Sequence, residues 1–116
     1  MADITLTRIA NGDRDVVTWE TLTSSNAAGT AYDSDGLRMA VATFQAFGTF
    51  DSATLVLQGS NDGTNWVTIV DSSTTSAISL TAAGYAEVST AFAYIRPSTS
   101  GGGGSQDIDC ILVARG

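Results

Sequence analysis

Two acidic residues in the first third of the chain have the spacing of metal ligands. Asp33 and Asp35 lie in the segment 32–36, YDSDG, and are spaced like the first ligands of a calcium-binding loop. Calcium prefers oxygen ligands, but a complete loop supplies further carboxylates after its central glycine. The next carboxylate after Gly36 is Asp51. The segment therefore favours a solvated turn in which the Asp side chains cap their own backbone.

The residue types that most enzymes use for nucleophilic and acid–base chemistry are scarce. The chain has no His and no Lys, which excludes a Ser-His-Asp triad and a His-based zinc site. The single Cys, Cys110, lacks a His or Lys to activate it, and it alternates with apolar residues in the segment 108–113, which predicts a buried core position. Nothing in the sequence indicates the paired carboxylates of a glycosidase. We expect no enzymatic activity and no catalytic, cofactor-binding or metal-binding residues.

The charge of the chain excludes several classes of partner. Twelve acidic residues against five Arg give a net charge of -7, and such a surface repels nucleic-acid phosphates and anionic lipids. No apolar run approaches the roughly 20 residues of a membrane-spanning helix. The N-terminal residues lack the basic start and apolar core of a secretory signal. We expect no nucleic-acid partner, no membrane partner and synthesis in the cytoplasm of the host.

The elements that must position any functional residues are short strands. Segments rich in β-branched and aromatic residues, with alternating polarity and bounded by turn residues, recur along the chain. They cover residues 4–8, 16–22, 37–47, 53–58, 66–70, 77–81, 85–89, 92–97 and 107–114. The pattern predicts an all-β protein, a single antiparallel β-sandwich of jelly-roll-like type with about eight short strands. In residues 107–114 both faces are apolar, so this strand is central or its second face meets another chain.

A chain of 116 residues is expected to form one domain covering residues 1–116. Residues 1–36 are predicted to form, in part, an extended N-terminal arm and a long loop, because the stretch 23–35 is longer than a compact connection needs. The segment 98–105, STSGGGGS, is predicted to be a mobile hairpin tip between the last two strands.

The clearest local signal is the segment 55–69, LVLQGSNDGTNWVTI. It places the turn residues Asp62 and Gly63 between two alternating apolar runs, which predicts a β-hairpin. Gly63 is expected to have a positive φ. Trp66 and Phe44 are predicted to pack in the core.

Three parts of the sequence together resemble a known class of viral proteins. They are the segment 57–66, LQGSNDGTNW; the segment 94–97, YIRP, with the glycine-rich stretch after it; and the closing segment 111–116, ILVARG. These are similar to small β-sandwich proteins from tailed-bacteriophage structural modules, which include capsid decoration (cement) proteins. The motif around the turn also occurs in discoidin-like, carbohydrate-binding sandwiches, where it is a turn and not a sugar site.

The resemblance implies a structural virion protein. Such a protein would bind the outer capsid surface as a homo-oligomer, with a trimer favoured over a dimer, and stabilise contacts between subunits of the major capsid protein. The alternative is a carbohydrate-binding or host-adhesion module on a phage virion. The candidate contact residues for the capsid or for another copy are Arg8, Arg14, Trp19, Tyr32 and Arg38. For each Arg, an ordinary surface charge is the other interpretation.

Overall fold

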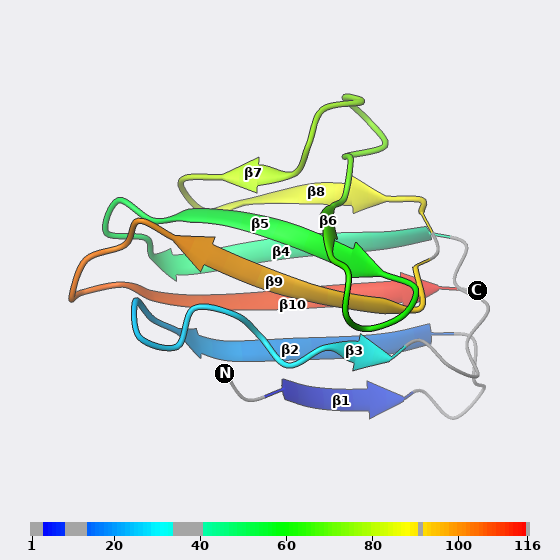
Figure 1. Ribbon diagram of the computed structural model, residues 1–116, viewed down its shortest axis with the longest axis horizontal. Helices are drawn as coiled ribbons and strands as arrows, with labels where there is room; N and C mark the ends of the chain where they lie inside the picture. The colour runs from blue at the N-terminus through cyan, green and yellow to red at the C-terminus, as the bar shows by residue number, and fades with distance from the viewer. Residues whose placement is uncertain (1–3, 9–13, 34–40, 91, 116) are drawn as a thin grey trace.

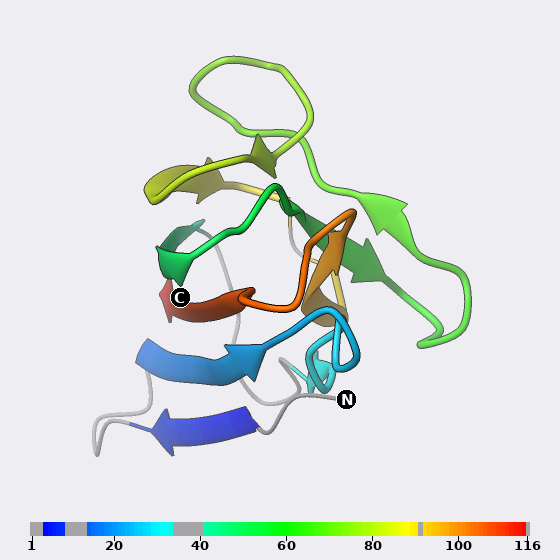
Figure 2. The same cartoon turned by 90° about the vertical axis from the view of Figure 1, so that its left-hand side faces the viewer.

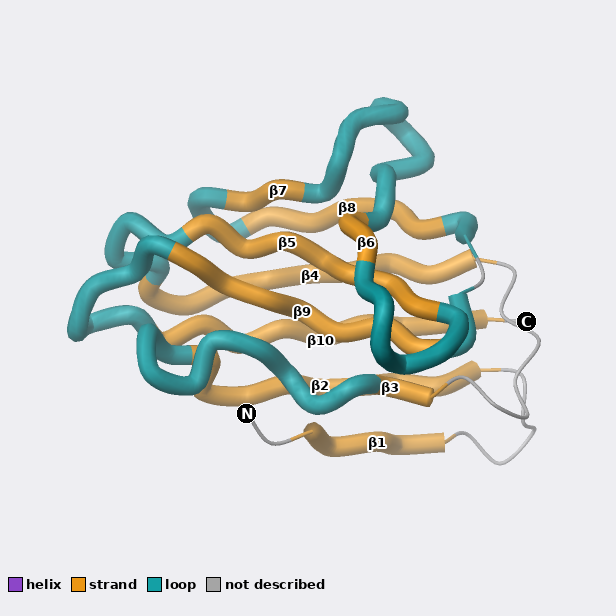
Figure 3. Tube along the Cα trace, viewed as in Figure 1, coloured by secondary structure: helices purple, strands orange, loops and turns teal. Residues whose placement is uncertain are grey.

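The computed structural model describes the backbone of residues 4–8 and both backbone and side chains of residues 14–33, 41–90 and 92–115. Strands and loops make up all of these ranges (Figure 3). Within them, the structure contains no helix with the length and apolarity needed to cross a membrane.

Ten strands are described. They are β1 (Ile4–Arg8), β2 (Arg14–Leu22), β3 (Tyr32–Asp33), β4 (Val41–Thr49), β5 (Thr54–Ser60), β6 (Val67–Thr68), β7 (Ser79–Leu80), β8 (Gly84–Val88), β9 (Tyr94–Ser100) and β10 (Asp107–Arg115). Every segment predicted as a strand overlaps one of them. The two-residue strand β3 was not predicted, because it is too short to give an alternating pattern.

The strands form two antiparallel sheets that pack face to face. The first sheet has the order β1-β2-β10-β4-β8, and the second has the order β3-β9-β5-β6, with β7 also paired to β5. Figure 1 shows the second sheet in front of the first, and Figure 2 shows the two layers edge-on. The chain passes repeatedly between the layers, and the orders β2-β10-β4-β8 and β3-β9-β5-β6 are those of a jelly roll. The predicted all-β sandwich is confirmed.

The core lies between the two sheets and follows from the alternation of side chains along each strand. In β10 the inward residues Cys110 and Leu112 are fully buried, and in β5 the inward residues are Leu55 and Leu57. Phe44 is also fully buried, as predicted. Each large apolar side chain buried in this way stabilises the fold by about 1.5–3 kcal/mol relative to an exposed one.

The predicted hairpin around Gly63 is confirmed. β5 and β6 are antiparallel, with Gln58 opposite Thr68. In the turn the carboxylate of Asp62 accepts hydrogen bonds from the backbone N–H groups of Thr64 and Asn65, both at 2.8 Å. Gly63 has a φ of 77°.

The N-terminal part of the chain is more integrated into the sandwich than an extended arm would be. β1 pairs with β2 along its whole length, so both are strands of the first sheet. The stretch after β2 runs along β9: the N–H of Gly29 donates to the carbonyl of Pro97 at 2.9 Å, and the N–H of Thr99 donates to the carbonyl of Ala27 at 2.8 Å. The part of the predicted long loop up to Asp33 is therefore an irregular edge of the second sheet.

The glycine-rich segment was wrongly predicted to join two strands of one hairpin. β9 belongs to the second sheet and β10 to the first, so the segment crosses between the layers. Asp51 holds it, because the Asp51 carbonyl accepts from the N–H of Gly103 at 3.0 Å and its carboxylate accepts from the N–H of Ser105 at 2.9 Å. This connection is anchored at one end of the sandwich.

Candidate functional site

Trp19, a predicted contact residue, lies in the core. Its side chain is fully buried on the inner face of β2, and the indole Nε1 donates a hydrogen bond to the carbonyl of Thr30 at 2.7 Å. The physical reason is the alternation of β2, which places Trp19 on the same side as buried Val17 and opposite to exposed Glu20. The prediction that Trp19 contacts a partner is wrong.

Tyr32 is also buried, with 1% of its surface exposed. Its hydroxyl donates a hydrogen bond of 2.6 Å to the carboxylate of Asp15, which is itself fully buried. Because Tyr32 belongs to the second sheet and Asp15 to the first, this bond joins the two layers. The prediction of a surface contact at Tyr32 is corrected to a role in joining the sheets, since its short strand turns the ring inward against β9.

Of the three predicted Arg contacts, Arg14 is the one whose side chain the structure describes. It is exposed at the start of β2, and its backbone is directly opposite Arg115 of β10. Arg8 ends β1, of which the backbone alone is described, and Arg38 lies outside the described residues. The pairing of Arg14 with Arg115 was not predicted, because it depends on a register between the second and the last strand of the first sheet.

Trp66 was predicted to lie in the core but is half-buried on the outer side of the second sheet. The guanidinium of Arg96 lies over its ring, 4.1 Å from the ring centroid, and Arg96 Nε donates to Oε1 of Gln58 at 2.9 Å. Gln58 and Arg96 are opposite each other on β5 and β9. We call Trp66, Arg96 and Gln58 the Trp66 cluster. It presents an oriented cation beside an aromatic ring.

The outer face of the first sheet is a second candidate surface. Its central strand, β10, places Ile111 and Val113 outward, where both are half-buried. Large apolar side chains of the neighbouring strands are more exposed: Val41 at 53% and Phe47 at 40% on β4, and Tyr85 at 69% on β8. We call this surface the first-sheet face. Of the two interpretations of residues 107–114, the central strand is confirmed, and contact of its second face with another chain stays a prediction.

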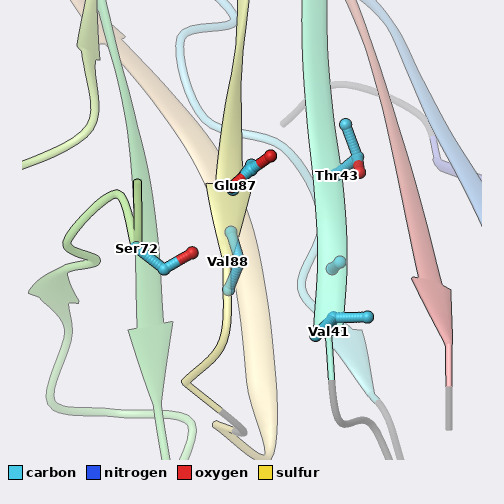
Figure 4. A pocket seen from close by; sticks show the side chains of 6 residues that line it. Val41, Thr43, Ser72, Glu87 and Val88 are labelled. Atoms are coloured by element: carbon cyan, nitrogen blue, oxygen red, sulfur yellow. The ribbon is translucent and has the colours of Figure 1, made fainter. Parts of the chain in front are cut away.

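A pocket of about 260 Å³ lies at the β4–β8 edge of the first sheet. Figure 4 shows Val41 and Thr43 on β4, Glu87 and Val88 on β8, and Ser72 on the loop before β7. Its single carboxylate is Glu87. Among the residues that the structure describes, no three side chains of His, Cys, Asp or Glu are grouped so as to hold a metal ion.

A second pocket, of about 310 Å³, lies beside the β5–β6 hairpin and includes Asp62, Asn65 and Phe92. Hydrogen bonds from the backbone N–H groups of Asn65 and Thr64, and from the Asn65 and Ser60 side chains, hold the pKa of the Asp62 carboxyl far below its usual range. Asp62 therefore carries a negative charge at neutral pH and organises the turn.

Cys110 is fully buried, as predicted, and its burial, together with the nearby charge of Asp109, raises the pKa of the thiol to about 12. Because the thiolate is the reactive form, native Cys110 is expected to resist iodoacetamide at roughly pH 8 and to react once urea unfolds the chain. Mass spectrometry of the intact protein checks both states. Equal alkylation rates in the native and unfolded protein would contradict this assignment.

Solved structures share the fold. An alignment with the SPBc2 prophage-derived protein YomS covers 89% of this chain and 95% of YomS, with a TM-score of 0.60 and 6% identity. One with the PBSX exported protein XepA covers 100% of this chain and 37% of XepA, with a TM-score of 0.53 and 15% identity. No protein-family model matches the chain, and no curated protein matches its sequence. At these identities the likeness establishes the β-sandwich fold.

Proposed function

We propose that this chain is a structural protein of a bacteriophage virion, which acts by binding and not by catalysis. Its specific role is that of a decoration or cement protein on the outer capsid surface, where it associates with itself and stabilises contacts between subunits of the major capsid protein. Two findings support the phage origin: the sequence resemblance described above, and a fold shared with YomS, whose name describes it as prophage-derived, over most of both chains.

The observation that carries the proposal is that side chains suited to binding a partner lie on both outer faces of one small sandwich. The first-sheet face carries exposed Val41, Phe47 and Tyr85, and the second sheet carries the oriented Arg96 on Trp66. A protein that cements a lattice must contact at least two bodies, and two opposite faces meet that requirement. Repeated weak contacts on a symmetric lattice then add through multivalency.

Binding to capsids that lack the protein tests this role. The purified chain is expected to co-sediment with such capsids, and Trp66→Ala and Arg96→Ala are each expected to weaken binding by about tenfold or more, because aromatic and Arg residues dominate binding energy. Thr81→Ala, an exposed position in the turn before β8, is the control that should bind normally. A wild-type chain that stays in the supernatant at every concentration would refute the capsid role.

Carbohydrate binding is the second candidate function, and the half-buried Trp66 is the observation that favours it, because aromatic rings stack on sugars. The guanidinium of Arg96 already occupies one face of this ring at 4.1 Å, which reduces the area that a sugar could cover. Binding to a glycan array that is lost in Trp66→Ala, together with no binding to capsids, would favour this function over the first.

A further inference from the structure

The first-sheet face is charged at its two ends and largely neutral between them. β10 defines its long axis, with Asp107, Asp109, Ile111, Val113 and Arg115 on the outer side. Eight residue steps separate Asp107 from Arg115, which corresponds to roughly 27 Å along an antiparallel strand. The acidic and basic ends of the face are therefore well separated in space.

The neighbouring strands strengthen this separation. At the basic end, Arg115 is opposite Arg14 on β2 and Val41 on β4. At the acidic end, Glu20 is exposed near the end of β2, and Oδ1 of Asp109 accepts a hydrogen bond of 2.9 Å from the N–H of Thr21 in the same part of β2. Two cations thus mark one end of the face and three carboxylates the other.

The middle of the face is uncharged across four strands. Ile111 of β10 is opposite Thr18 of β2 and Gln45 of β4, and Gln45 is opposite Tyr85 of β8. Val113, one step nearer the basic end, is opposite Val16 and Thr43. A carboxylate does occur near the basic half: Glu87, on β8, lies opposite Thr43 at the margin of the face.

We propose that the first-sheet face binds a second copy of this chain across a two-fold axis that crosses the strands at Ile111. An interface formed about a two-fold axis is isologous, which means that both copies contribute the same surface. An axis parallel to the strands would place Arg14 and Arg115 of one copy against the same residues of the other. An axis across the strands places them against Glu20 and Asp107, and Coulomb attraction selects that arrangement.

The size of the face is compatible with a stable pair. Three strands of 9 residues, about 30 Å long, and two of 5 residues, about 17 Å long, spaced about 4.8 Å apart, give a face of roughly 600 Å². A standard interface buries about 800 Å² per partner. Ile111 would lie near Ile111 of the second copy, with Val113 and Tyr85 around it, so that the apolar centre is covered and the charged ends form the rim. This arrangement resembles the aligned packing of two sheets in a sandwich.

This inference deepens the self-association in the proposed function and replaces the expected three-fold symmetry by a two-fold one. Its test uses no capsids, so that self-association can fail while capsid binding succeeds, and the reverse. The wild-type chain is expected to sediment with twice its mass of 11.9 kDa. A monomer at the highest soluble concentration, or a trimer, would overturn the two-fold pairing.

Charge reversal at one end tests the geometry. A variant with Arg14→Glu and Arg115→Glu has two acidic ends. A variant with Glu20→Arg and Asp107→Arg has one basic end and a second end where two cations outnumber the remaining carboxylate of Asp109. Each variant alone is expected to self-associate at least about tenfold more weakly than the wild type, because like charges now meet at the rim. An equal mixture is expected to form pairs that contain one copy of each variant, detectable by native mass spectrometry.

The control variant carries Thr64→Glu and Thr74→Glu, at exposed loop positions outside the face. It adds two negative charges and is expected to change self-association by less than about twofold, because distant exposed charges are screened by salt. Far-UV circular dichroism verifies that every variant is folded. Failure of the two folded reversal variants to pair with each other would overturn the proposed axis, even if the wild type is a dimer.

Discussion

Replacing Trp19 by Ala is expected to lower the free energy of unfolding by about 3–5 kcal/mol. The indole is fully buried, and its Nε1 donates a hydrogen bond to the carbonyl of Thr30. Thr30 lies just before β3, at the edge of the second sheet. It is also closely packed, because a Cβ built on Gly29 would lie 2.5 Å from Cδ1 of Trp19. The substitution therefore opens a cavity and removes a hydrogen bond between the two layers. Urea denaturation followed by far-UV circular dichroism measures the loss.

Trp66→Ala is the matched control, because it removes the same side chain from a half-buried position. The expected loss is about 1–2 kcal/mol, from partial apolar area and the cation–π contact with Arg96. Trp19→Phe is expected to fall between the two, since it keeps an aromatic ring but loses the donor to Thr30. Equal losses for Trp19→Ala and Trp66→Ala would contradict the placement of the two tryptophans.

Gly48→Ala is expected to lower the free energy of unfolding by about 2–4 kcal/mol, the second largest effect. Gly48 has a φ of 110°, and a Cβ on it would lie 2.4 Å from the carbonyl oxygen of Asp107, which is backbone. Because Gly48 pairs with Ile108 within the first sheet, the clash can be relieved only by moving β4 away from β10. Chemical denaturation gives the change in stability.

Gly84→Ala provides the contrast in the same sheet. The nearest atoms to its added Cβ are Cδ2 of Leu80 at 3.6 Å and the carbonyl of Ala82 at 3.8 Å, which are ordinary contacts. The free energy of unfolding of this variant is expected to stay unchanged or to rise by up to about 1 kcal/mol, since Ala reduces the entropy of the unfolded chain. No loss of stability at Gly48 would contradict the described register of β4 with β10, and a large loss at Gly84 would contradict the space described around it.

The sequence predicts the strands well because each carries a local signal. Alternation in β10 identifies both buried Cys110 and the apolar outer side at Ile111, and the Asp62-Gly63 turn identifies the hairpin. The same alternation could have placed Trp19, which shares a side with buried Val17, but not Trp66, because Val67 is exposed although it alternates in phase with buried Ile69. Trp66 was predicted to point inward because it begins a strand directly after a turn, and the structure shows it half-buried instead.

Other features could not be predicted because they depend on distant pairings. Tyr32 is buried through a two-residue strand against β9 and through its bond to Asp15, which no local pattern indicates. The charge separation of the first-sheet face requires the registers of β10 with β2 and with β4. Of the predicted contact residues, Arg14 is the one that the structure places on this face.

The position of β10 also determines when the protein can fold. β10, the last of the described strands, is the centre of the first sheet, between β2 and β4. During synthesis, β2 and β4 therefore lack their common neighbour until β10 has been made. Long sequence separation between paired strands makes folding slow, on the order of milliseconds to seconds. We expect the nascent chain to be prone to aggregate before β10 is available to pair with β2 and β4, and truncation within β10 to abolish the native state.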